Sequence, residues 1–143
     1  MLNSLTKKLT TYGFGTRSLT EEDFHRICAD FEIEVIYERV KRPFYMRLMD
    51  QEFIVLNRRS RGLRNLFDSF HELAHALEHG GKSHEVALFR GLVKSKEEVE
   101  ADTFALLAII PESALESFLE ENSTRFARKL FRERERVRVL FGL

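Results

Sequence analysis

The segment from His71 to His75, which reads His-Glu-Leu-Ala-His, is the strongest constraint in this sequence. It lies in an apolar, helix-forming run, and residues four positions apart project from the same face of a helix. Both imidazoles can therefore reach a single metal ion if the segment is helical. Glu72 directly follows the first histidine, where metal hydrolases carry the general base that acts on water. The segment thus predicts a helix with a metal-dependent hydrolytic site, with His71 and His75 as ligands.

A hydrolytic zinc site needs a third protein ligand and one open position for water. The acidic stretch downstream offers three carboxylates, Glu97, Glu98 and Glu100. Helical spacing favours Glu98, because Glu98 shares a face with small residues that would allow a close approach to the motif helix. That face consists of Glu98, Ala101, Asp102, Ala105, Ala108 and Ile109. We therefore predict that Glu98 is the third ligand.

Asp102 lies one helical turn after Glu98. A carboxylate there can accept a hydrogen bond from the imidazole nitrogen that faces away from the metal, which fixes the tautomer of the ligand. We expect His71 to be its partner. The alternative interpretation is that residues 97–100 form an acidic first helical turn that the helix dipole stabilises. The motif upstream favours the metal site.

The two segments together resemble the ImmA/IrrE family of gluzincin-type metallopeptidases. After the His-Glu-x-x-His motif, the sequence continues with Glu-x-x-Ala-Asp-x-Phe-Ala, from Glu98 to Ala105, and then with Pro111. Upstream, three short apolar stretches match the strands that precede the motif helix in this family. They are residues 31–35, 44–47 and 53–57. The resemblance implies a small zincin-like domain.

The resemblance also implies a function, that of a zinc-dependent endopeptidase. Family members of known role cleave helix-turn-helix repressors that control stress-response or mobile-element genes, so a protein substrate of that kind is expected. Mn²⁺, Co²⁺ and Fe²⁺ suit the same nitrogen and oxygen ligands as Zn²⁺. The alternative function is a non-proteolytic, metal-containing interaction module that binds a repressor or another protein. The intact Glu72 favours the peptidase, because a structural metal site has no use for a base.

The pattern of apolar residues predicts an α+β fold. We expect a short three-stranded sheet, antiparallel or mixed, packed on the motif helix and further helices. All of residues 1–143 would form one domain, with residues 1–18 as an N-terminal arm or a short helix. The expected strands are residues 33–37, 44–49 and 52–57, the last two joined at Asp50-Gln51. The expected helices are residues 20–31, 63–78, a helix that contains Glu98 and ends before Pro111, residues 111–120, and a last helix capped by residues 122–124.

A peptidase must hold its substrate extended beside the metal, and a peptide that adds as a strand to a sheet edge meets this need. Residues 44–48 are the expected edge, because Pro43 suits an edge position and residues 53–56 have a more buried pattern. The alternative is an outer strand that Arg47 protects against aggregation.

Other polar residues have weaker claims to a role in catalysis. His84 lies in the loop 81–94, from which an imidazole can overhang a cleft and stabilise an oxyanion. Tyr45 and Arg90 are equally weak candidates. His79, one turn after the motif, is more often a C-terminal helix residue that the helix dipole stabilises than a ligand. The run from Arg132 to Arg136 alternates in charge, which predicts an ion-paired, solvated helix face rather than a nucleic-acid site.

Composition fits an ordinary globular domain. The formal net charge is zero, so nothing indicates nucleic acid or an anionic membrane as a partner. No apolar run is long enough to span a bilayer. Cys28 is the only cysteine and is expected in the core. A single cysteine and the lack of an apolar signal segment predict a cytoplasmic location. The sequence does not predict the oligomeric state.

Overall fold

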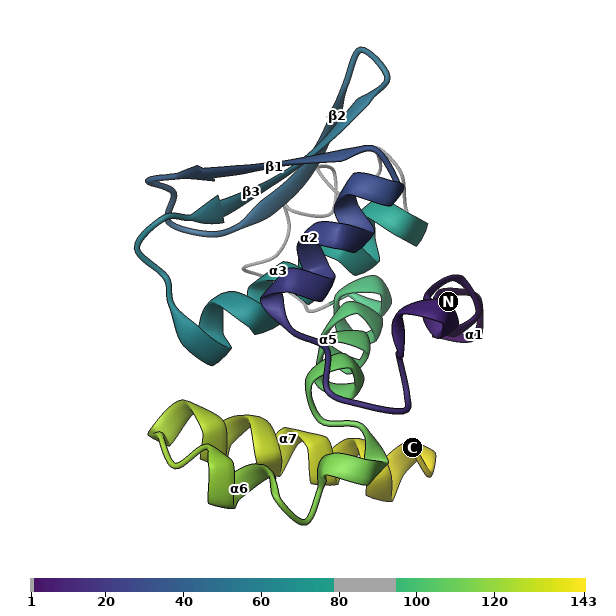
Figure 1. The fold of residues 1–143 in the computed structure, drawn as a ribbon, viewed down its shortest axis with the longest axis vertical. Helices are drawn as coiled ribbons and strands as arrows, with labels where there is room; N and C mark the ends of the chain where they lie inside the picture. Colours follow the sequence, from purple (N-terminus) through teal and green to yellow (C-terminus); the bar gives the residue numbers. More distant parts are fainter. Residues whose placement is uncertain (1, 79–94) are drawn as a thin grey trace.

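The computed structural model describes residues 2–78 and 95–143. Figure 1 shows a small sheet covered on one side by helices, with two C-terminal helices at the opposite end from the sheet. The helices are α1 (Leu2–Leu9), α2 (Glu21–Asp30), α3 (Gly62–Glu78), α5 (Lys96–Ile109), α6 (Phe118–Glu121) and α7 (Arg125–Phe141), with 3-10 turns η1 (Thr10–Tyr12) and η2 (Glu112–Ala114). The strands are β1 (Ile33–Glu38), β2 (Phe44–Leu48) and β3 (Gln51–Asn57). The prediction of an α+β fold is confirmed.

The three strands form a mixed sheet in the order β1-β3-β2. β1 runs parallel to β3, whereas β2 runs antiparallel to it. Leu48 pairs with Gln51, so the hairpin loop consists of Met49 and Asp50 rather than Asp50-Gln51 as expected. Both loop residues have positive φ angles, 50° and 67°, which matches the right-handed twist of the two strands. β3, the most buried strand, is central, and β2 lies at an edge.

Helix α2 begins at a complete capping box. The Thr20 hydroxyl accepts a hydrogen bond from the Asp23 amide at 3.2 Å, and the Asp23 carboxylate accepts one from the Thr20 amide at 2.8 Å. Arg17 donates to the same carboxylate at 2.8 Å. The Arg17 guanidinium holds the pKa of Asp23 well below its usual range. These contacts fix the helix that covers β1.

Helices α3 and α5 pack directly against each other, and Figure 1 shows α5 beside α3 on the side away from the sheet. The small residues predicted for this face, Ala101, Ala105 and Ala108, are fully buried. Ser95 caps α5 by accepting a hydrogen bond from the Glu98 amide at 3.1 Å. Small side chains allow two helix backbones to approach closely, which brings the first turn of α5 to the motif helix.

Aromatic side chains join these layers into one core. The Phe70 ring on α3 meets Phe24 on α2 and Phe104 on α5 edge-on, with centroids 5.8 and 6.3 Å apart. Phe14 stacks on Phe104 at 5.0 Å. Each such pair adds about 0.5–1.5 kcal/mol beyond the burial of its area. Cys28 belongs to this core, as expected, and burial raises the pKa of its thiol to about 12.

The structure distinguishes between two alternatives for the N-terminus and corrects one predicted helix. Residues 2–9 are helical, with Leu5 and Leu9 fully buried, so the helix and not the extended arm is present. The single helix predicted for residues 111–120 is wrong, because η2 and α6 replace it. Ser113 there donates to the Thr16 carbonyl oxygen at 3.1 Å. Such tertiary contacts override a helical propensity that is weak over so short a segment.

Helix α7 begins as predicted, with the Thr124 hydroxyl accepting a hydrogen bond from the Ala127 amide. The pair Glu133–Arg136 is present at 3.4 Å. Arg134, expected on the solvated face, is instead fully buried and donates to the Ile110 carbonyl oxygen at 2.6 Å. A strong acceptor at the end of α5 thus draws one arginine of the charged run inward. In the described residues, no helix is long and apolar enough to cross a membrane.

Candidate metal centre

His71 and His75 lie one turn apart on the face of α3 that points toward α5. Their side chains are buried, with exposed fractions of 8% and 1% for the two residues. The two Nε2 atoms are 3.3 Å apart. The spacing of four residues therefore brings the two imidazoles together at one point.

Glu98 reaches the same point from the first turn of α5. Its two carboxylate oxygens lie 3.1 Å from Nε2 of His71 and 2.7 Å from Nε2 of His75. One donor atom from each of the three residues falls within 4.8 Å of the others, and no second cluster of this kind occurs in residues 2–78 and 95–143. Glu97 and Glu100 are not members of the cluster. The geometry of the cluster therefore favours Glu98 among the three glutamates, as helical spacing does.

The three donor atoms fit a divalent metal ion. Ligand atoms about 2.0–2.1 Å from a tetrahedral ion are about 3.3 Å from one another. The observed separations of 3.3 Å between the imidazole nitrogens and 3.1 Å between His71 and Glu98 match this value. Two imidazole nitrogens and one carboxylate are also the donors that zinc has in many hydrolases. The third separation, 2.7 Å between Nε2 of His75 and a Glu98 oxygen, is shorter, so a first-row divalent metal would suit the site after a small shift of these two side chains.

The electrostatics of the metal-free cluster favour positive charge. Burial alone would lower the pKa of His71, but hydrogen bonds with Asp102 and Glu98 raise it to about 10. Burial alone would raise the pKa of Glu98, but hydrogen bonds from His71 and His75 hold it below its usual range. A proton here compensates buried carboxylates, and a divalent cation can take its place.

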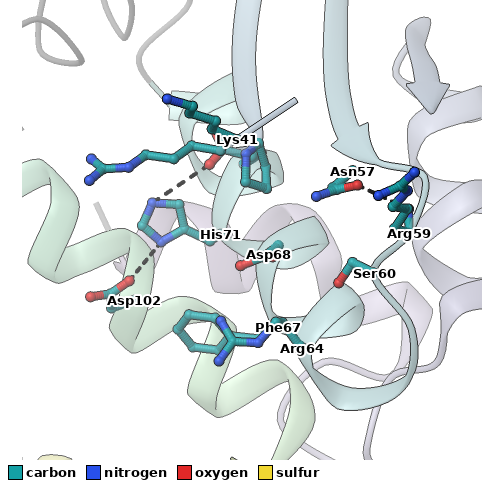
Figure 2. Close-up of a pocket in the computed structure, with 12 residues that line it drawn as sticks. Lys41, Asn57, Arg59, Ser60, Arg64, Phe67, Asp68, His71 and Asp102 are labelled. Atoms are coloured by element: carbon teal, nitrogen blue, oxygen red, sulfur yellow. Dashed lines mark hydrogen bonds and ion pairs between the residues drawn. The ribbon is translucent and has the colours of Figure 1, made fainter. Parts of the chain in front are cut away.

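Asp102 lies behind His71, one turn after Glu98 on α5. Its Oδ1 is 2.7 Å from Nδ1 of His71 (Figure 2), whereas Nε2 of the same ring faces Glu98. A carboxylate at Nδ1 keeps the proton on that nitrogen and leaves Nε2 as the donor atom for a metal. Asp102 thereby orients the ring.

Glu72 is buried beside the cluster but is not one of its three donors. Its exposed fraction is 2%, and its Oε2 lies 3.9 Å from Nε2 of His71. A carboxylate at that distance can contact a water molecule at the site without replacing a ligand.

A cavity of about 440 Å³ opens beside His71 and Glu72. Figure 2 shows side chains from the β1–β2 connection, from the end of β3 and from the start of α3 around it, with His71 and Asp102 on one side. Its lining is Lys41, Arg42, Pro43, Asn57, Arg59, Ser60, Arg64, Phe67, Asp68, His71, Glu72 and Asp102. The cavity therefore leads to His71 and Glu72 along a lining made mostly of polar residues.

Several of these lining residues were not predicted from the sequence. Asp68 is three residues before His71, so both lie on the same face of α3. Burial raises the pKa of Asp68. The arginines that line the cavity come from segments that contain no recognisable catalytic motif. Only the excess of basic over acidic residues in those segments could have indicated them. Tyr45, a weak candidate, is buried and donates to Glu52 at 3.1 Å, and it does not line the cavity. His79, His84, Arg90 and the loop 81–94 lie outside the described residues.

The contact between Asp102 and His71 leads to a prediction about metal affinity. Asp102→Ala should weaken zinc binding about 10- to 100-fold, because His71 loses the carboxylate that fixes its tautomer. Competition with a chromophoric chelator measures the affinity, and circular dichroism checks the fold. Glu97→Ala, one turn earlier on the same helix and outside the cluster, is the matched control. An Asp102→Ala protein that binds zinc like the control would remove Asp102 from the site.

Comparison with known proteins agrees with this geometry. No curated protein matches the chain significantly. The family model described as the IrrE N-terminal-like domain, a peptidase family, matches residues 28–141. The match includes α3, α5 and all three strands, and it covers most of the chain. The chain therefore belongs to the IrrE N-terminal-like peptidase family.

Proposed function

We propose that this protein is a zinc-dependent endopeptidase that hydrolyses a peptide bond in a regulatory protein. His71, His75 and Glu98 hold the metal ion, Glu72 is the general base, and Asp102 orients His71. The observation that carries the proposal is the convergence of two imidazoles and one carboxylate within 4.8 Å beside a second buried carboxylate, Glu72. Membership of a peptidase family supports it.

The chemistry divides between the ion and the side chains. A bound zinc ion polarises the scissile carbonyl and lowers the pKa of a neighbouring water to about 7. Glu72 accepts the proton of that water and later gives it to the leaving amine. The burial of Glu72 keeps its carboxylate in one position between these two steps. The buried Cys28, whose thiol pKa is raised to about 12, does not supply a nucleophile.

A purely structural metal site fits the same residues less well. Structural zinc sites have four protein ligands and are closed to solvent. In residues 2–78 and 95–143, three donors converge, and the cavity of about 440 Å³ reaches His71 and Glu72. An open position beside a base serves hydrolysis and has no use in an interaction module.

The substrate would bind as an additional strand on β2. In the described sheet, β2 pairs only with the central strand, β3. The other edge of β2 therefore faces away from the sheet. Pro43, directly before β2, lines the same cavity as His71 and Glu72. A peptide paired with β2 would therefore pass the metal centre in extended form. By the family resemblance, we propose that the substrate is a helix-turn-helix repressor.

The base is tested by Glu72→Gln. This variant should bind zinc like the wild type, because Glu72 is not a ligand, and should cleave a repressor or an unfolded protein such as casein about 100- to 10,000-fold more slowly. Gel electrophoresis of the products and metal analysis of the purified protein measure the two properties. Glu97→Gln is the matched control. A Glu72→Gln protein with normal cleavage would exclude the mechanism.

The β2 edge is tested by proline, which has no amide hydrogen to donate. Successive amides in a strand point alternately toward the neighbour and away, so Met46→Pro and Arg47→Pro are made as a pair. The variant that removes only an outward amide should keep its thermal stability and zinc content but lose cleavage of a protein substrate. If both variants fold, and both cleave at the wild-type rate, the substrate does not pair with β2.

A further inference from the structure

The zero net charge of the chain conceals a strong local excess of positive charge. Residues 39–64 contain eight Lys or Arg and only two Asp or Glu. Both acidic residues lie at the hairpin end, where Asp50 pairs with Arg47 at 3.2 Å and Glu52 accepts a hydrogen bond from Tyr45. The opposite end of the sheet, next to the metal centre, is therefore basic without acidic neighbours in its own segment.

Three side chains at that end form a surface that we call the cationic rim, namely Lys41, Arg42 and Arg59. All three are exposed and line the cavity beside His71 and Glu72. None of them forms an ion pair with a carboxylate in the part of the chain that the structure describes. Arg64, which also lines the cavity, differs because its guanidinium lies 4.4 Å over the Phe126 ring. The rim thus offers cationic groups that the described fold itself does not use.

The rim lies where a substrate strand would enter the site. Lys41 and Arg59 also line a smaller neighbouring cavity of about 240 Å³, together with Arg39 and Asn57. Pro43 joins the rim to Phe44, the first residue of the β2 ladder. A peptide on the outer edge of β2 would therefore place residues near its scissile bond against the rim.

We propose that the cationic rim binds acidic side chains of the peptide substrate and so selects sequences with Asp or Glu close to the cleaved bond. This inference rests on the proposed peptidase function and adds a class of substrate to it. Guanidinium groups bind carboxylates through paired hydrogen bonds, and an ammonium group adds a further charge-assisted bond. Charges at the rim of a binding surface steer and select a partner of opposite charge.

A peptide fits this surface better than a nucleic acid. Asp68, Glu72 and Asp102 line the same cavity, and their carboxylates would repel a continuous row of phosphates. The other arginine-rich segment, on α7, is partly neutralised, because Arg136 and Arg138 pair with Glu133 and Glu112 at 3.4 Å each. An acidic side chain presents one carboxylate to the rim, whereas the rest of the peptide is neutral.

The test measures binding, so that it does not depend on cleavage. Two fluorescein-labelled peptides with the same apolar frame, one carrying Glu and the other Gln, are titrated into zinc-loaded Glu72→Gln protein at low salt. Fluorescence anisotropy should show about tenfold tighter binding of the Glu peptide. Adding Lys41→Glu and Arg59→Glu should abolish the difference. Adding Arg58→Glu instead, a charge reversal next to Arg59 that does not line the cavity, should preserve it.

Two results would overturn the inference. The first is equal affinity for the Glu and Gln peptides. The second comes from competition between unlabelled Glu peptide and a single-stranded oligothymidine of equal charge. If the oligothymidine displaces the labelled Glu peptide at the lower concentration, the rim binds nucleic acid instead. A protein that prefers the Glu peptide but cleaves nothing as the zinc-loaded wild type would contradict only the proposed function.

Discussion

The packing of α5 against α3 is the interaction on which the rest of the site depends. It places Glu98 within 3.1 Å of His71 and 2.7 Å of His75. A buried carboxylate without a partner is costly, and so is a buried charged imidazole. Each therefore needs the other, or a metal ion, and the alanines on the facing side of α5 allow the close approach. The orientation of His71 by Asp102 follows from the same contact.

Much of this arrangement could be predicted from local spacing. Helical periodicity places His71 with His75, and Glu98 with Asp102, without any knowledge of the fold. Features that depend on distant segments could not be predicted. Arg134 is drawn inward by a carbonyl oxygen of Ile110, which is 24 residues away in the sequence. The break of the helix after Pro111 and the convergence of Lys41, Arg42 and Arg59 at one end of the sheet also depend on distant segments.

The buried metal centre and the surface beside it have opposite charges. In the buried cluster, carboxylates surround the position of a cation, and hydrogen bonds hold the pKa of Glu98 low and that of His71 high. At the surface, the cationic rim lines the same cavity, and its three side chains form no ion pair with a carboxylate among the described residues. A substrate that places its peptide bond at the metal centre and an acidic side chain at the cationic rim would complement both regions. The β2 edge connects them, because its first residue follows Pro43.

The central claim is that His71, His75 and Glu98 hold a single metal ion. Anomalous diffraction at the zinc edge from crystals of zinc-loaded protein tests it most directly. The account predicts one zinc peak about 2.0–2.2 Å from Nε2 of both histidines and from a Glu98 carboxylate oxygen. A peak at another place, or one with Glu97 or Glu100 as the carboxylate ligand, would contradict it.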